Sequence, residues 1–217
     1  MYNFDRDFDF KRVALSHYPR PSGLLLKRIF DAATSAFALM LLAPLFLLVA
    51  LLVKFDTSGP IFFSQRRGGR DGETFRIWKF RTMTTLDDGD QIEQAKKGDA
   101  RITRVGAVLR KYNVDELPQL YNVLIGDMSL VGPRPHAIAH DKYYKEAIPQ
   151  YFLRHGVAPG ITGWAQVNGL RGPTEDLNAM RTRVEYDIEY IQTWSLTLDL
   201  YILLLTVISP AAYRNAY

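Results

Sequence analysis

Cysteine is absent from this sequence, and its absence excludes several classes of protein at once. The chain has no disulfides, no cysteine-ligated zinc or iron–sulfur site and no thiol nucleophile. The same absence fits a working part that faces the reducing cytosol. Histidine is scarce as well: its four positions are scattered, and we interpret them as structural rather than as metal ligands (His17, His136, His140 and His155).

Common nucleotide-binding and metalloprotease motifs are also missing. The sequence has no GxGxxG segment, no Walker lysine motif and no HExxH segment. The segment Asp87-Asp88-Gly89-Asp90 resembles a metal-binding loop superficially, but it lacks the spacing and the closing glutamate of an EF-hand. We therefore predict a solvated turn there.

Neither sign of charge dominates strongly. Lys and Arg number 27 against 23 Asp and Glu, which gives a net charge of +4. This balance favours anionic partners, namely phosphates, nucleic acid or lipid headgroups, without choosing among them. Hydrophobic residues make up 47% and charged residues 23% of the chain, so a disordered or fibrous protein is excluded.

One long hydrophobic run is present, the uncharged segment of 22 residues from Ala32 to Val53. As a helix it would reach about 33 Å, enough to cross a bilayer core. Pro44 lies in its middle and predicts a bend, because proline lacks a backbone donor and clashes with the preceding turn. Basic residues flank both ends, whereas a crossing helix should show an asymmetry. The residues leave two topologies open, a spanning helix and a re-entrant helix that returns to its own side.

The run divides the chain into three parts. Residues 1–23 are predicted to be a leader, 24–56 the membrane helix, and 57–217 the rest of the chain, with a soluble body and an apolar C-terminal helix. In the last part we expect strands near 61–67 and 74–83 and helices near 102–112, 116–125, 136–152 and 184–209. The apolar end of the last helix suits either the headgroup region or a protein core. The predicted fold class is thus α/β, mostly helical with a small sheet.

The sharpest local motif is Asp115-Glu116-Leu117-Pro118-Gln119. Asp115 is a good N-cap, and proline is tolerated in the first turn, so a helix is predicted to begin here. The two carboxylates can hold Mg²⁺ while leaving one oxygen free, and such an aspartate can act as a nucleophile. A plain helix cap with an acidic first turn is the alternative.

Cations surround this motif in the sequence. Residues 60–111 contain twelve Lys and Arg, including Arg110, against seven Asp and Glu. On a strand, Lys79 and Arg81 would share one face and could grip a pyrophosphate, or else form a solvated face. Downstream, Pro133 and Pro135 hold Arg134 in a rigid loop. The glycine-rich block 159–172 offers Gln166 and Arg171, groups that could contact a nucleotide or sugar.

Taken together these segments resemble the bacterial sugar transferase family, the monotopic phosphoglycosyl transferases. The resemblance rests on KRIFD (27–31), KFRTM (79–83), LRKYNVDELPQLYNVLIGDMSLVGPRP (109–135), PGITGWAQVNGLRG (159–172) and WSLTLDL (194–200). It covers about residues 24–209. The finer pattern looks most like the undecaprenyl-phosphate glucose-phosphate transferases that begin exopolysaccharide repeat units, and the chain resembles their minimal catalytic unit.

The resemblance implies transfer of a hexose-1-phosphate, most simply glucose-1-phosphate, from a UDP-sugar to undecaprenyl phosphate with release of UMP. Asp115 would be the nucleophile of a covalent aspartyl-phosphosugar intermediate, with Glu116 as its partner at Mg²⁺. Substrate contacts would come from a further set of residues: Lys79, Arg81, Arg110, Gln119, Pro133, Arg134, Pro135, Gln166 and Arg171. The family's re-entrant helix breaks at Ser-Pro; this chain has Ala43-Pro44 instead, so the proline remains while the capping hydroxyl is missing.

The same resemblance implies a monotopic protein of the bacterial cytoplasmic (inner) membrane, in which residues 24–56 form a re-entrant helix hairpin. Residues 57–217 would be a cytosolic catalytic domain with a membrane-associated C-terminal helix, on the cytoplasmic face. The expected partners are UDP-hexose, undecaprenyl phosphate and the membrane, without nucleic acid. The sequence leaves a homodimer open, and it does not settle which hexose is moved. A second hypothesis is a membrane-tethered basic binding or scaffold module of a polysaccharide-synthesis complex, which would leave the Asp-Glu pair unexplained.

Overall fold

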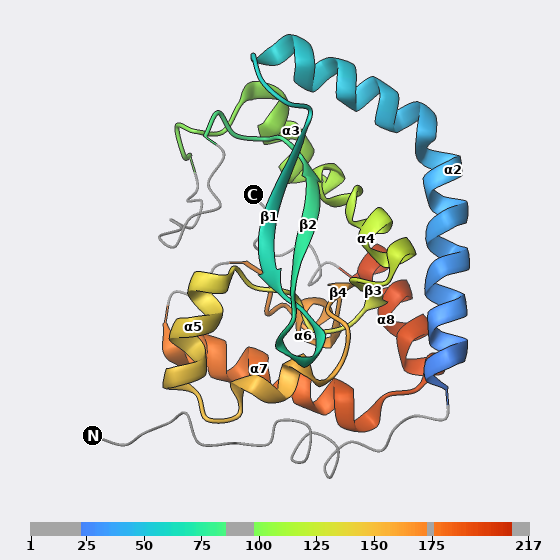
Figure 1. Cartoon of the computed structure of the whole chain (residues 1–217), viewed down its shortest axis with the longest axis vertical. Helices are drawn as coiled ribbons and strands as arrows, with labels where there is room; N and C mark the ends of the chain where they lie inside the picture. The colour runs from blue at the N-terminus through green and yellow to red at the C-terminus, as the bar shows by residue number, and fades with distance from the viewer. Residues whose placement is uncertain (1–22, 86–97, 173–175, 210–217) are drawn as a thin grey trace.

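A computed structural model of the chain describes residues 23–85, 98–172 and 176–209. The predicted leader, apart from Gly23, and the Asp87–Asp90 turn lie outside these residues. The described chain is mostly helical, with two small two-stranded sheets (Figure 1). The predicted α/β class, mostly helical with little sheet, is therefore confirmed for the described residues. They contain two small sheets, whereas the sequence predicted one.

The hydrophobic run forms α2, a helix from Leu24 to Asp56 that contains Pro44 and bends part-way along its length (Figure 1). Its most apolar window has a mean hydropathy of 2.9, and only 11% of that window is buried. Large side chains such as Phe37, Met40 and Leu47 are exposed by 64–70%. Within the described ranges it is the one helix long and apolar enough to cross a bilayer. Such exposure is costly in water, so α2 suits a membrane anchor rather than a core helix.

The two predicted strands form an antiparallel hairpin. Strand β1 (Phe62–Gly68) pairs with β2 (Thr74–Phe80), in a register that sets Phe62 opposite Phe80. The turn between them contains a 3-10 helix, η1 (Arg70–Gly72), with Asp71 in the left-handed region at φ 58°. A second sheet joins β3 (Ser129–Val131) in parallel to β4 (Gly160–Thr162). This sheet brings the loop after Val131 beside the glycine-rich block.

The helices lie close to their predicted places, with differences at their ends. Helix α3 spans Arg104–Lys111, and α4 spans Gln119–Ile125, preceded by the 3-10 helix η2 (Val114–Glu116). The segment predicted as one helix over 136–152 contains α5 (Ile138–Ala147) and the start of the 3-10 helix η3 (Tyr151–Gly156). A short helix, α6 (Trp164–Val167), follows β4.

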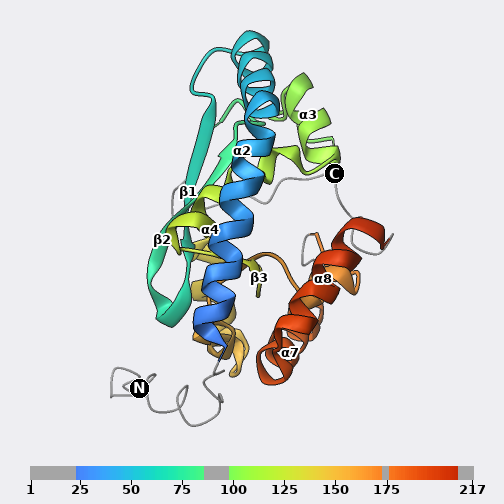
Figure 2. The ribbon, with the colours of Figure 1, turned by 90° about the vertical axis from the view of Figure 1, so that its right-hand side faces the viewer.

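The predicted C-terminal helix is two helices, α7 (Leu177–Thr193) and α8 (Leu196–Ile208). The break occurs because Ser195 adopts an extended conformation and its hydroxyl accepts a hydrogen bond from the Leu198 amide, which starts a new helix. Figure 2 shows α7 and α8 on one side of α2 and the β1–β2 hairpin on the other. The outer face of α8 exposes apolar side chains, including Val207 at 71% and Ile208 at 61%.

Three apolar clusters hold the elements together. The largest joins α4, β3, α7 and α8 against the N-terminal half of α2, around Val123, Val131 and Ile202. A second joins Phe80 and Leu109 to the C-terminal part of α2. The third lies between α5, η3 and α7, around Tyr151. Helix α2 is thus an integral part of the fold, because two of the three clusters need its inner face.

A buried ion pair fixes the start of α2 to α8. Asp199 is 1% exposed; it accepts hydrogen bonds from Lys27 Nζ at 2.6 Å, from the Tyr190 hydroxyl at 2.8 Å and from Trp194 Nε1 at 3.2 Å. Lys27 Nζ also donates to the Val131 carbonyl at 3.2 Å. This explains why an aspartate stands in the otherwise apolar α8: it is the counter-charge for α2.

Replacing this lysine should destabilise the protein strongly. In Lys27→Met, Asp199 would keep its buried charge without a cation, which costs about 3–5 kcal/mol. We expect a lower unfolding midpoint in detergent micelles, followed by circular dichroism. Lys54→Met, which removes an exposed lysine at the other end of α2, is the control and should change the midpoint little. Equal shifts in the two variants would contradict the assignment.

Candidate functional site

The Asp115-Glu116 pair lies in η2, between α3 and α4. Asn113 precedes it with φ at 57°, in the left-handed region that asparagine tolerates. The amide of Glu116 donates to the Asn113 carbonyl at 3.2 Å, which closes the turn. The prediction that Asp115 is an N-cap is therefore wrong: the chain reverses at Asn113, and α4 begins only after Pro118. Asp115 is 6% exposed and Glu116 8%.

Glu116 is surrounded by cations from three distant parts of the chain. Lys79 of β2 donates to its Oε1 at 2.7 Å. Arg134 binds both carboxylate oxygens of Glu116 in a fork geometry: Nη1 donates to Oε2 at 3.0 Å, and Nη2 donates to Oε1. Arg171 Nη2 lies 3.9 Å from Oε2 and donates to Asn113 Oδ1 at 2.5 Å. The fold thus brings together Lys79, Glu116, Arg134 and Arg171, all of which the sequence singled out.

The electrostatics differ sharply between the two carboxylates. Burial alone would raise the pKa of Glu116, but Arg134 and Lys79 outweigh it and hold that pKa well below its usual range. Burial raises the pKa of Asp115, Lys79 opposes this rise, and the neighbouring Glu116 adds to it. Two adjacent acids with pKa values moved in opposite directions are a frequent feature of catalytic sites.

Asp115 has the less restrained carboxylate of the two. Among the described residues its oxygens accept no hydrogen bond, and they are not among the fully enclosed polar atoms. Lys79, Arg110 and Arg134 all act on its charge. An anionic oxygen that keeps contact with solvent, beside several cations, can attack or bind a phosphate group.

The remaining candidates lie outside this cluster of contacts. Arg81 follows β2, which ends at Phe80, so the strand alternation that would align it with Lys79 does not extend to it. Its guanidinium donates to the Thr57 carbonyl at 2.7 Å and to the Ser58 carbonyl, at the C-terminal end of α2. Gln119 is fully buried, and its amide atoms have no hydrogen-bond partner among the described residues. Gln166 Nε2 donates to the Ile161 carbonyl at 3.2 Å.

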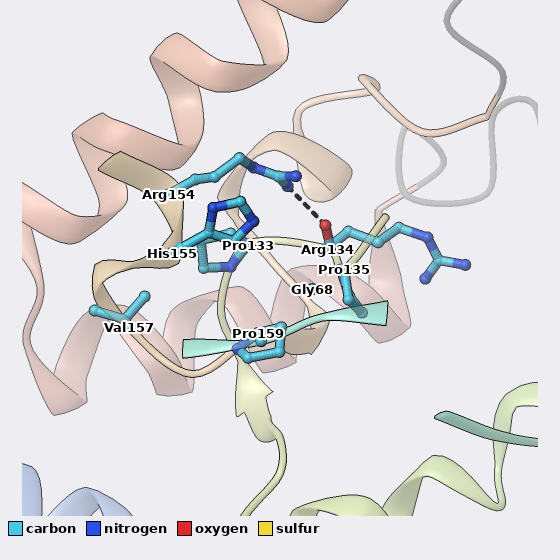
Figure 3. Close-up of a pocket in the computed structure, with 9 residues that line it drawn as sticks. Gly68, Pro133, Arg134, Pro135, Arg154, His155, Val157 and Pro159 are labelled. Carbon is cyan, nitrogen blue, oxygen red and sulfur yellow. Dashed lines mark hydrogen bonds between the residues drawn. The ribbon is translucent and has the colours of Figure 1, made fainter. Parts of the chain in front are cut away.

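The proline loop, residues 133–135, has contacts on two sides. The Arg134 side chain contacts Glu116, and the Arg134 backbone carbonyl is bound by Arg154. Arg154 Nη2 donates to the Arg134 carbonyl at 2.6 Å, and Figure 3 shows the Arg134 side chain directed away from Arg154. A pocket between this loop, Gly68 and Pro159 has a volume of only about 10 Å³. That is room for about one water molecule, too little for a nucleotide.

Two carboxylates suit a magnesium ion that is shared with a substrate. Among the described residues no group of three or more His, Asp or Glu side chains forms a metal cage. Mg²⁺ needs only one or two carboxylates when phosphates complete its shell. The unbonded carboxylate of Asp115 fits this role, and of the two Glu116 oxygens Oε2 carries fewer close donors than Oε1.

Histidines near the loop should make stability depend on pH. Burial, together with Arg154 and Lys145, lowers the pKa of His155 to about 3, from 6.5. The unfolded chain therefore binds a proton below pH 6.5 that the folded chain does not, so stability falls as pH falls below that value. The loss should reach about 2 kcal/mol at pH 5.

Urea unfolding at pH 7 and pH 5 measures this loss. In His155→Asn the difference between the two pH values should shrink by about 2 kcal/mol. A smaller dependence of the same sign should remain, because burial and Arg154 also hold the pKa of His136 well below its usual range. An unchanged difference in the variant would contradict the assignment.

Sequence reasoning missed the residues behind the loop. Arg154 and Asp187 are both nearly fully buried and form an ion pair in which two donors meet one oxygen: Nε donates to Oδ2 at 3.0 Å and Nη2 donates to the same Oδ2 at 2.8 Å. Asn113, the partner of Arg171, was missed too. The sequence around these residues is itself rich in polar and charged side chains, so nothing in it separates them from exposed residues.

An exposed apolar helix joined to a buried carboxylate pair ringed by cations defines a membrane-associated protein built to handle anionic groups. The chain belongs to the bacterial sugar transferase family, whose model matches residues 22–212. It is therefore an enzyme of the phosphoglycosyl transferase class, as expected from its motifs.

Named relatives refine this assignment. The chain is 54% identical over 199 residues to a UDP-glucose:undecaprenyl-phosphate glucose-1-phosphate transferase of Caulobacter vibrioides, covering 92% of this chain and 74% of that protein. A protein of the same name from Xanthomonas campestris is 50% identical over 195 residues, 89% of this chain and 40% of its own length. The exopolysaccharide production protein PSS of Rhizobium leguminosarum is 49% identical, over 86% of this chain and 95% of its own. The chain thus spans less than half of some relatives and nearly all of others.

Proposed function

We propose that this protein transfers glucose-1-phosphate from UDP-glucose to undecaprenyl phosphate and releases UMP, as the first step of assembling an exopolysaccharide repeat unit. The observation that carries the proposal is the Asp115 carboxylate, free of hydrogen bonds among the described residues and adjacent to a glutamate clamped by Lys79 and Arg134. The names of the relatives from Caulobacter vibrioides and Xanthomonas campestris supply the two substrates.

The proposed reaction has two displacements at one phosphorus atom. In the first, an oxygen of Asp115 bonds to the phosphorus that carries the sugar, the bond from that phosphorus to the bridging oxygen breaks, and UMP leaves. In the second, an oxygen of undecaprenyl phosphate bonds to the same phosphorus and the Asp115 carboxylate leaves. Both products balance without an added proton or electron. Two steps through a carboxylate replace one direct displacement between anions, which mutual repulsion disfavours.

The cations around Glu116 have a defined part in this scheme. Lys79, Arg134 and Arg171 are held around one carboxylate, so they are oriented before a diphosphate arrives. Such preorganisation is where much of the stabilisation of a charged transition state comes from. A bound Mg²⁺, held by Asp115 and Glu116, would screen the phosphate charges.

A direct assay tests the transfer. Purified protein in detergent, given UDP-[¹⁴C]glucose, undecaprenyl phosphate and Mg²⁺, should form labelled lipid and release UMP in equal amounts, and EDTA should stop both. A panel of UDP-hexoses should show UDP-glucose as the best donor. A protein that binds the substrates but forms no labelled lipid with any of these donors would overturn the proposed function, leaving the basic scaffold module as the better account.

We also propose that α2 is re-entrant, so that both of its ends lie on the cytoplasmic face, and that the apolar outer face of α8 rests in the headgroup region. The bend of α2, its proline and its cationic flanks support the first part. Both ends of α2 also contact the same domain, through Lys27 to Asp199 and through the Asp56 carboxylate, which accepts from the Val105 amide at 3.0 Å.

The absence of cysteine makes this topology simple to test. Two variants with a single cysteine each, Ser22→Cys and Ser58→Cys, place the cysteine just before the N-terminal end and just after the C-terminal end of α2. With a membrane-impermeant maleimide, both should be labelled in inside-out vesicles and neither in intact spheroplasts. Labelling of one site from each face would show a spanning helix and contradict the re-entrant one.

A further inference from the structure

Every N–H group of the Arg154 side chain has a hydrogen-bond acceptor. Arg154 is 3% exposed and lies in η3, and its guanidinium and Nε carry five N–H groups in a fixed fork. Nε and one N–H of Nη2 point to Asp187 Oδ2, and Nη2 also donates to the Arg134 carbonyl at 2.6 Å. Nη1 donates to His136 Nδ1 at 2.7 Å and to the Tyr151 hydroxyl at 3.2 Å. The five donors meet five acceptor contacts, so this side chain has one defined position.

The partners of Arg154 are themselves fixed. Because arginine only donates, His136 Nδ1 must be the acceptor, and the proton of the neutral ring lies on Nε2. Tyr151, which is fully buried, donates its hydroxyl proton to Asp141 Oδ1 at 2.6 Å. Asp187 is 2% exposed and belongs to α7. The network is therefore anchored to α5, α7 and η3 together.

Within the described residues, this network connects to the Asp115-Glu116 pair through the Arg134 peptide. Figure 3 shows the hydrogen bond from Arg154 to the Arg134 carbonyl. The guanidinium of the same Arg134 donates to both carboxylate oxygens of Glu116. Pro133 and Pro135 remove much of the backbone freedom on either side. The Arg134 carbonyl can still rotate with the Arg134 backbone, and the hydrogen bond from Arg154 opposes that rotation.

We infer that Arg154, held by Asp187, is a positioning residue of the transferase: it fixes the Arg134 peptide so that the Arg134 guanidinium meets Glu116 in the fork geometry. This role rests on the proposed function. Neither Arg154 nor Asp187 touches Glu116 or Asp115 among the interactions of the described residues. A misplacement of about 1 Å in a group that orients reacting atoms can cost about 100-fold in rate.

A double-mutant cycle separates this role from a merely structural one. Arg154→Lys keeps the charge and a bond to Asp187 but cannot reach all its acceptors, and we expect kcat/KM to fall about 10- to 100-fold. In an Arg134→Lys background, where the fork is already lost, the same change should cost less than about 3-fold. Equal losses in both backgrounds would overturn the inference, because a structural defect acts whatever occupies position 134.

The matched control is another buried arginine near the loop. Arg183 of α7 donates to the Gly172 carbonyl at 2.9 Å, and no hydrogen bond among the described residues links it to the Arg134 carbonyl. The effects of Arg183→Lys and Arg134→Lys on kcat/KM should be additive, so the loss from Arg183→Lys should be the same in both backgrounds. Circular dichroism and unfolding midpoints confirm that each variant is folded.

A second variant keeps the test decisive if Arg154→Lys does not fold. Asp187→Asn preserves the shape of the side chain and weakens its hold on Arg154, so it should show the same non-additivity with Arg134→Lys. Wild-type protein without transferase activity would instead refute the proposed function. An active wild type with additive losses in the cycle would refute only the positioning role.

Discussion

Asp115→Asn should abolish formation of labelled undecaprenyl lipid. The amide has nearly the same size as the carboxylate but cannot form the acyl phosphate, so we expect kcat to fall by about 10⁴-fold or more. Because burial raises the pKa of Asp115, removing its charge should also leave stability equal or slightly higher at pH 7. Loss of activity in a fully folded variant is the expected combination, measured by lipid labelling beside the unfolding midpoint.

An exposed aspartate provides the control. Asp71 lies at the tip of the β1–β2 hairpin with its side chain 66% exposed, so Asp71→Asn should keep full activity. Substantial transfer by Asp115→Asn, above the level that deamidation back to aspartate explains by mass spectrometry, would remove Asp115 from the mechanism.

Arg134→Met should give the second largest effect, and it should act on stability as well as on rate. The substitution removes the fork on Glu116 and leaves the buried carboxylate with Lys79 at 2.7 Å and the more distant Arg171. We expect kcat/KM to fall about 10²- to 10³-fold, as when a group that stabilises a phosphate transition state is removed. Stability should fall by about 3 kcal/mol, because the buried charge of Glu116 loses the cation that contacts both of its oxygens.

A second substitution separates these two effects. In Arg134→Met combined with Glu116→Gln the buried charge of Glu116 is removed together with its arginine, so stability should recover in part while activity stays low. Arg70→Met, which removes an arginine with a 64% exposed side chain, is the control and should leave both nearly unchanged. Recovery of activity in the double variant would show that Arg134 serves only to neutralise Glu116.

The sequence predicted those parts of the site whose residues stand in compact motifs. Asp115 and Glu116 are adjacent, and Pro133 and Pro135 bracket Arg134, so local chemistry alone marks them. Lys79 was found through its alternation with aromatic residues, a pattern that a strand explains. The same reasoning extended the strand to Arg81, whose side chain instead donates to carbonyls at the end of α2. Periodicity cannot show where a strand stops.

What stayed hidden depends on contacts between distant segments. Arg154 and Asp187 are 33 positions apart, and Asn113 and Arg171 are 58 apart. Nothing in either neighbourhood distinguishes these residues from exposed ones, because burial is a property of the fold. The break at Ser195 is different: its serine N-cap was present in the sequence, but the apolar periodicity on both sides concealed it.

The most direct test of the central claim is to look for the sugar phosphate on the protein. Wild-type enzyme mixed with UDP-[¹⁴C]glucose and Mg²⁺, without lipid acceptor, should release one equivalent of UMP in a burst and gain the mass of one esterified hexose phosphate. Peptide mapping should place that mass on the peptide containing Asp115, and added undecaprenyl phosphate should move the label to lipid. Rapid transfer to lipid with no burst of UMP and no labelled protein at any time would contradict the account.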